Sequence, residues 1–112
     1  MLDKYSASRL NIVPVKKARP DTYEAVFNAL AHAARRRILM TLHFEGGSMT
    51  AGELAALFAH AWQTTTRHLQ VLEAAGLIRH ERRGRQRIYR LETSRLALAK
   101  DWLAWFTRKE GR

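Results

Sequence analysis

Residues 62–68 form a run of side chains suited to recognising another molecule, and they read Trp-Gln-Thr-Thr-Thr-Arg-His. Gln63 can pair bidentately with adenine and Arg67 with guanine, while threonines offer hydroxyls to phosphate and methyls to thymine. Three consecutive β-branched threonines are poor helix formers, so surface chemistry explains them better than helix stability. The residues predicted to contact nucleic acid are Trp62, Gln63, Thr64, Thr66, Arg67 and His68.

A second run, residues 79–90, concentrates positive charge, with six arginines and one acid, Glu81. Arginines this close repel one another unless an anion lies alongside, and guanidinium groups suit phosphate or a narrow minor groove. The arginines predicted to grip a nucleic-acid backbone are Arg82, Arg83, Arg85 and Arg87. Three more, at 35–37, open a helix and oppose its dipole, so they either pair elsewhere or point at phosphate.

The composition agrees with a polyanionic partner. The 112 residues suffice for one domain, and 20 Lys+Arg against 10 Asp+Glu give a net charge of +10. The absence of cysteine excludes disulfides, thiolate metal sites and cysteine nucleophiles, and it fits a reducing compartment. No apolar run is long enough to cross a membrane and the start has no signal-peptide stretch, so we expect a cytoplasmic protein without a membrane partner.

Hydrophobic periodicity predicts the elements that position these residues. Residues 1–20 form a basic arm with two prolines, and residues 21–112 form one domain. Capping boxes are expected at Asp21 with Glu24 and at Thr50 with Glu53. We expect helices at about residues 21–30, 33–44, 53–58, 62–75 and 94–109, and strands at 77–82 and 85–91.

This order of elements predicts a mainly α-helical fold with a small β-hairpin. Two helices joined by a tight turn and followed by a basic hairpin form the layout of a winged helix–turn–helix. The helix that begins at Trp62 then has a polar N-terminal half that can enter the major groove, while its later half turns apolar at Leu69 and Leu72. The run 79–90 becomes the wing.

The last helix carries two adjoining apolar stripes, which is more than a peripheral helix needs for docking on a small domain. Large aromatic side chains left exposed on a monomer would form a sticky patch. A symmetric dimer interface explains them, and an intramolecular core accounts for some of them as an alternative. The predicted interface residues are Tyr23, Phe27, Leu98, Trp102, Trp105 and Phe106.

Residues 22–106 resemble the ArsR-type winged helix–turn–helix transcriptional repressors. The segments that carry the resemblance are 27–39, 49–55, 66–78 and 84–91, and the third, TRHLQVLEAAGLI, is the most specific. The resemblance implies a homodimer joined through the first and last helices, operator binding by paired recognition helices, and usually repression of a nearby operon.

The sequence departs from the metal-sensing members of that family. It has no cysteine, and its last helix offers only Asp101 and Glu110 as ligands. None of its five histidines has another His, Asp or Glu three or four positions away, so no helical ligand pair exists. We therefore expect a member of the metal-independent subgroup, with no cofactor and no catalytic site.

Three further possibilities stay open at this point. A winged helix can bind structured RNA instead of double-stranded DNA, or it can serve as a protein-interaction adaptor. The wing arginines argue against the adaptor, which has no use for them. A small-molecule effector is also compatible with a repressor, and the aromatic dimer interface is where it would bind.

Overall fold

The computed structural model describes residues 20–58 and 62–108. Residues 1–19 of the arm expected over residues 1–20 lie outside the described residues, as do the turn at 59–61 and the end of the last helix beyond residue 108. The helices are α2 (Pro20–Leu30), α3 (Ala33–Phe44), α4 (Ala51–Ala55), α5 (Trp62–Ala74) and α6 (Ser94–Thr107). The strands are β1 (Ser48–Thr50), β2 (Ile78–Arg83) and β3 (Gln86–Leu91). The predicted winged helix–turn–helix is thus confirmed.

Two helix starts differ from the sequence expectation. The capping box at Thr50 forms as predicted: the Thr50 hydroxyl accepts from the Glu53 amide at 3.1 Å, and the Glu53 carboxylate accepts from the Thr50 amide at 2.9 Å. Because a helix begins directly after its cap, α4 covers 51–55 and the expected span of 53–58 was wrong. Helix α2 begins at Pro20, which places Asp21 in the first turn and not at the cap.

The sheet has three strands, one more than the predicted hairpin. Their order is β1-β3-β2 and both pairs are antiparallel, with Met49 of β1 opposite Tyr89 of β3. Gly46 and Gly47 follow α3 with φ angles of 92° and 98°, a region that favours glycine. They turn the chain so that the Gly47 carbonyl accepts from the Leu91 amide at 2.8 Å. The predicted helix stop therefore also delivers β1 to the sheet.

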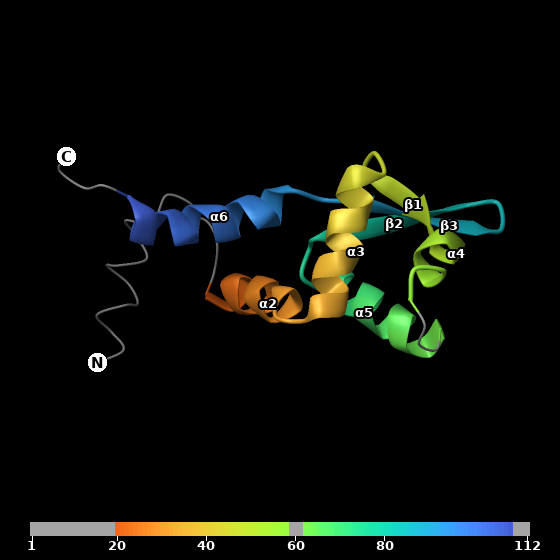
Figure 1. The fold of residues 1–112 in the computed structure, drawn as a ribbon, viewed down its shortest axis with the longest axis horizontal. Helices are drawn as coiled ribbons and strands as arrows, with labels where there is room; N and C mark the ends of the chain where they lie inside the picture. The colour runs from red at the N-terminus through yellow and green to blue at the C-terminus, as the bar shows by residue number, and fades with distance from the viewer. Residues whose placement is uncertain (1–19, 59–61, 109–112) are drawn as a thin grey trace.

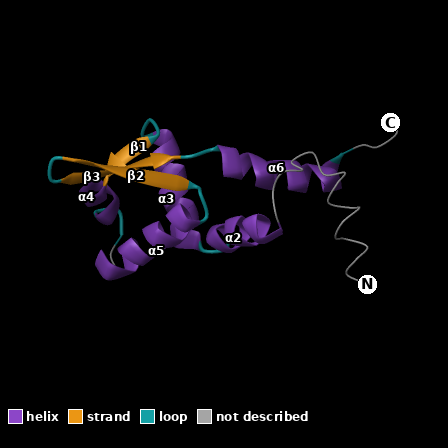
Figure 2. Ribbon diagram, turned by 180° about the vertical axis from the view of Figure 1, so that it is seen from behind, coloured by secondary structure: helices purple, strands orange, loops and turns teal. Residues whose placement is uncertain are grey.

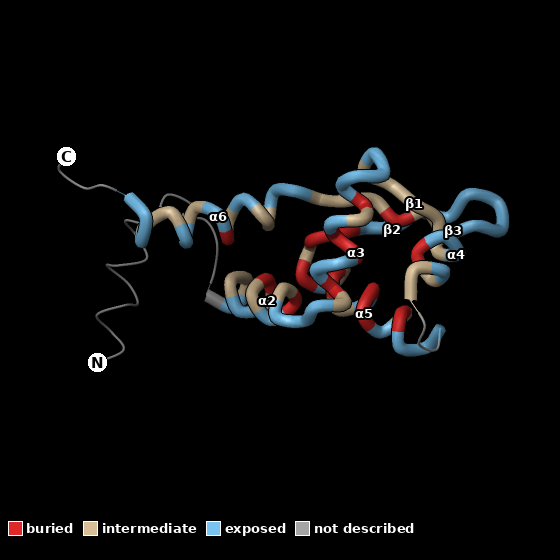
Figure 3. The backbone as a smooth tube through the Cα atoms, viewed as in Figure 1, coloured by how far each residue is buried: buried red, intermediate tan, exposed pale blue. Residues whose placement is uncertain are grey.

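The core lies around α3 and the later half of α5. Its largest fully buried side chains include Ile38, Leu42, Leu69 and Leu72, and Figure 3 shows the buried segments gathered there. Truncating one of these leucines to alanine would cost about 2–5 kcal/mol. This rigid centre holds α5 against the sheet, since α5 contacts α2, α3 and β2.

The elements predicted to contact DNA and to form a dimer interface lie at opposite ends of the molecule. Helices α2 and α6 pack against each other at one end, and the tip of the β2–β3 hairpin, α4 and the start of α5 lie at the other (Figure 1). Figure 2 shows the hairpin reaching out on the side away from α6. Over the described residues, no helix combines the length and apolarity needed to span a membrane.

Candidate nucleic-acid interface

Helix α5 presents one polar face and buries the other. Thr65, Leu69 and Leu72 turn inward and are fully or almost fully buried. The 3.6-residue period then leaves the opposite side exposed. That exposed face carries Trp62, Gln63, Thr64, Arg67 and Gln70. Four of the six predicted contact residues therefore lie where a ligand can reach them.

The two other residues predicted for this helix lie away from its exposed face. His68 is only 9% exposed and its Nδ1 lies 3.3 Å from Arg35 Nη1, so its burial excludes it from the contact face. Thr66 is half-buried and its hydroxyl oxygen lies beneath the surface, which withdraws that hydroxyl from phosphate. Sequence reasoning missed Gln70, which is exposed seven positions after Gln63 and shares its stripe on the helix.

A groove joins the start of α5 to the wing. Trp62, which is 45% exposed, lies along it. The groove is lined by Thr50, Ala51, Gly52, Trp62, Arg82, Arg85, Gln86 and Arg87, a set without any acidic side chain. The structure thus brings three of the four predicted wing arginines next to the start of α5.

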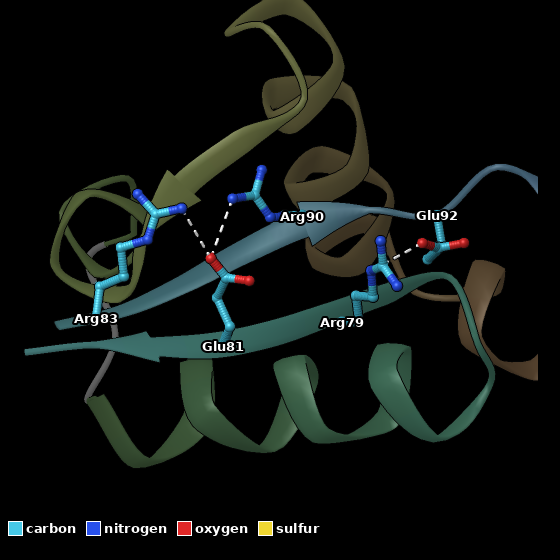
Figure 4. A network of polar contacts seen from close by, with 5 residues as sticks. All are labelled: Arg79, Glu81, Arg83, Arg90 and Glu92. Carbon is cyan, nitrogen blue, oxygen red and sulfur yellow. Dashed lines mark hydrogen bonds and ion pairs between the residues drawn. The ribbon is translucent and has the colours of Figure 1, made fainter.

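One set of wing charges is partly balanced by carboxylates of the protein itself. Glu81 Oε2 lies 3.1 Å from Arg90 Nη2 and 3.1 Å from Arg83 Nη2, and Glu92 Oε2 lies 2.9 Å from Arg79 Nε (Figure 4). The hydrogen bond and the charge of Arg90 hold the pKa of the Glu81 carboxyl below its usual range. Arg83 was predicted to touch DNA, but its nearest charged partner is this glutamate.

The other wing arginines carry no such compensation. Arg82 and Arg87 lie directly opposite each other on β2 and β3, on the face that also carries buried Tyr89. Like charges in this arrangement destabilise a sheet. Among the described residues no carboxylate pairs with Arg82, Arg85 or Arg87, and the Arg87 Nε is buried without a hydrogen-bond partner there. An anion in the groove would relieve this repulsion.

The arginines at the start of α3 mostly serve the fold. Arg35 Nε and Nη2 donate to the carbonyls of Ala29 and Asn28 at 2.9 and 3.0 Å, and Arg36 Nη1 donates to the Leu30 carbonyl at 2.8 Å. The last carbonyls of α2 lack partners within their own helix and carry its negative dipole end, so cations stabilise them. Of the two explanations offered for these cations, pairing elsewhere holds for Arg35 and Arg36. Arg37 lies over the Phe58 ring at 5.1 Å.

The aromatic face of α2 and α6 is partly packed and partly exposed. Phe27 and Trp102 meet edge to face with ring centroids 5.3 Å apart, and Trp102 lies 4.9 Å from Phe106. Trp102, Leu103 and Phe106 nevertheless remain 38%, 52% and 72% exposed. Tyr23, Leu98 and Trp105 are half-buried, and burial together with the Asp101 carboxylate raises the pKa of Tyr23. An intramolecular core accounts for some of this face and leaves a broad apolar remainder.

Two of the histidines have partners within the protein. His80 Nδ1 lies 2.8 Å from Glu73 Oε1, which ties β2 to α5, and His68 contacts Arg35. Across the described residues no three His, Asp or Glu side chains gather closely enough to hold a metal ion. His60 and Glu110 lie outside that part of the chain, and the expectation of a metal-free protein stays a prediction.

Comparison with known proteins agrees with this geometry. A helix-turn-helix domain family matches residues 30–81. The transcriptional repressor SdpR of Bacillus subtilis (strain 168) is 36% identical over 84 residues, which cover 75% of this chain and 91% of that protein. A crystal structure of an ArsR family transcriptional regulator superposes with a TM-score of 0.75 at 32% identity, covering 85% of this chain and 97% of that one. The chain belongs to the ArsR family of transcriptional regulators.

A further likeness concerns the assembled form of such proteins. The solution structure of a homodimeric winged helix-turn-helix DNA-binding domain from Mycobacterium bovis, a possible ArsR-family regulator, has a TM-score of 0.61 at 26% identity and covers 80% of this chain and 81% of that one. As an ArsR-family regulator, the present chain is a DNA-binding transcription factor. Its helix α5 occupies the second helix of the predicted helix–turn–helix.

Proposed function

We propose that this ArsR-family regulator is a homodimeric repressor that acts in the cytoplasm, reads a specific double-stranded operator, and needs neither metal nor catalysis. The observation that carries the proposal is the acid-free groove of Arg82, Arg85 and Arg87, which lies directly beside the exposed face of α5. Uncompensated arginines next to a polar helix face match a surface made for phosphate and base edges together.

The exposed residues of α5 divide by chemistry. Gln63 and Arg67 read base edges in the major groove, because an amide pairs with adenine and a guanidinium with guanine in bidentate fashion. Thr64 and Gln70 contact phosphate or a neighbouring base. Trp62 lies where the helix meets the arginine groove and packs against the sugar–phosphate backbone. The wing arginines hold that backbone without reading sequence.

Dimerisation places two such surfaces on one operator. The exposed apolar side chains of α6, among them Leu103 and Phe106, need a cover that one protomer does not supply. A second copy related by two-fold symmetry would cover them, and the Mycobacterium bovis relative is homodimeric. Two recognition helices then lie about 34 Å apart, one turn of DNA.

A small-molecule effector fits the same end of the molecule. A recess between α2 and α6 is lined by Tyr23, Glu24, Phe27, Asn28 and Trp102. A ligand bound there would touch both helices of the proposed dimer interface. It would therefore change the spacing of the recognition helices without occupying the DNA surface.

Selection of bound fragments from a random duplex pool, at a stated salt concentration, tests the proposal, with sedimentation of the same sample for its mass. We expect enrichment of an inverted repeat with half-sites about one helical turn apart, bound by a dimer. Equal affinity for duplex RNA and duplex DNA would support the RNA-binding alternative instead. Failure to retain any nucleic acid would support the adaptor.

A further inference from the structure

We propose that Arg35 and His68 are positioning residues that lock the recognition helix α5 to the end of α2, and so fix how α5 is presented to DNA. The inference rests on the proposed function for its consequence. Its geometric basis is the buried guanidinium of Arg35, which contacts α2 and α5 at once.

The guanidinium of Arg35 uses all three of its nitrogens, two toward the end of α2 and one toward α5. Nε and Nη2 donate to the carbonyls of Ala29 and Asn28 at the end of α2, while Nη1 lies 3.3 Å from His68 Nδ1 on α5. The Arg35 guanidinium is always protonated and can only donate, so Nδ1 of His68 serves as the acceptor in this contact. A lysine ammonium has no planar fork and would not span the same three partners.

Burial shows that this contact is not a casual surface pair. Arg35 is 7% exposed and His68 is 9% exposed, yet the guanidinium's hydrogen-bond partners among the described residues are two backbone carbonyls and an imidazole, not a carboxylate. Burying a charge among neutral partners costs desolvation free energy, and an apolar side chain of similar size would pack with a smaller penalty. A requirement for one defined arrangement of α2 and α5 explains why a charged side chain is buried here.

The position of this contact connects the two ends of the molecule. His68 directly follows Arg67, so any rotation of α5 that releases His68 also moves the guanidinium proposed to read DNA. The ring of His32, at the corner between α2 and α3, lies 5.0 Å from the ring of His68 and supports it from a second side. Because α2 also packs on α6, the contact links the proposed dimer helices to the reading face.

Two substitutions at one position separate positioning from bulk packing. His68→Asn keeps an acceptor near the place of Nδ1, whereas His68→Leu keeps the volume and removes the acceptor. We expect His68→Leu to lower the ratio of specific to non-specific DNA affinity about tenfold, comparable to losing one base contact. It should also broaden the tolerated half-site spacing. His68→Asn should keep both properties near those of the parent, and melting temperatures serve as the control for folding.

A measurement without DNA keeps this inference separate from the proposed function. The chain has no cysteine, so two cysteines replacing exposed Glu24 on α2 and exposed Ala74 on α5 can carry spin labels. The α2–α5 distance distribution should broaden with His68→Leu and with Arg35→Lys but not with His68→Asn. Arg35→Lys provides the answer if His68→Leu fails to fold.

The outcomes are then unambiguous. Unchanged distance distributions in both His68→Leu and Arg35→Lys would overturn the inference, whatever the DNA measurements show. A lower melting temperature with an intact specificity ratio would overturn it too, because that pattern belongs to a purely structural contact. Broadened distributions in a protein that binds no DNA would uphold the lock and refute the proposed function.

Discussion

The two sets of wing arginines should contribute differently to the salt dependence of DNA affinity. The variants Arg85→Ala and Arg83→Ala test this as a matched pair. Each phosphate neutralised by a protein cation contributes about 0.9 to the slope of log affinity against log salt. Arg85 lines the acid-free groove, so its removal from both protomers should flatten the slope by about 1.8. A fourfold rise in salt would then weaken the parent about 12-fold more than the variant.

Arg83→Ala should flatten the slope by less than half as much, because Glu81 already lies 3.1 Å from the Arg83 guanidinium. The assay is fluorescence anisotropy with a labelled duplex from about 50 to 200 mM salt. Both variants should weaken operator and unrelated duplexes alike, since phosphate contacts carry no sequence information. If Arg83→Ala flattens the slope as much as Arg85→Ala, the assignment of the groove as the DNA-facing side is wrong.

Three further substitutions address the remaining parts of the surface. Arg67→Ala should cost about 1–3 kcal/mol on operator DNA and relax the base preference at one position, measured by competition with single-base operator variants; parent-like discrimination would remove Arg67 from the reading face. Phe106→Glu should produce monomers in sedimentation, because this ring is 72% exposed within the protomer and the new charge would lie in the proposed interface; a surviving dimer would place the interface elsewhere. Glu81→Gln should release Arg83 and Arg90 for DNA and steepen the salt slope, and tighter binding of unrelated duplexes is the readout. Since Arg90 lowers the pKa of Glu81 in the folded state, the stabilisation from this network is present above the ordinary carboxyl pKa and is lost as the pH falls through the lowered value. Glu81→Gln should remove this pH dependence of stability. Acid unfolding at the same pH as in the parent would contradict this expectation.

Local sequence signals predicted most of the fold because they act within a few residues. The Thr50 and Glu53 capping box and the Gly46-Gly47 stop both depend on neighbours in the chain, and both formed as expected. Strand β1 was not predicted, because three residues are too few to show an alternating pattern. It exists because β3 offers an edge opposite it.

Side-chain directions within the site could not be read from the sequence in the same way. Whether His68 or Arg67 faces DNA depends on the rotation of α5 about its axis, which its contacts with α2, α3 and β2 set. Likewise, Arg82 and Arg83 are neighbours, and a shift of one residue in strand register would exchange their faces. The hydrogen bonds of Arg35 depend on where the end of α2 lies, and no local pattern specifies that.

The opposed pair Arg82 and Arg87 on the hairpin has a thermodynamic consequence for the free regulator. In the absence of a polyanion, added electrolyte screens the mutual repulsion of the two guanidinium groups and should raise the melting temperature of the hairpin. The same electrolyte competes with phosphate and loosens the complex. Added salt should therefore stabilise the free hairpin but weaken the complex with DNA. The thermal stability of the wing and its affinity for DNA are thus thermodynamically linked.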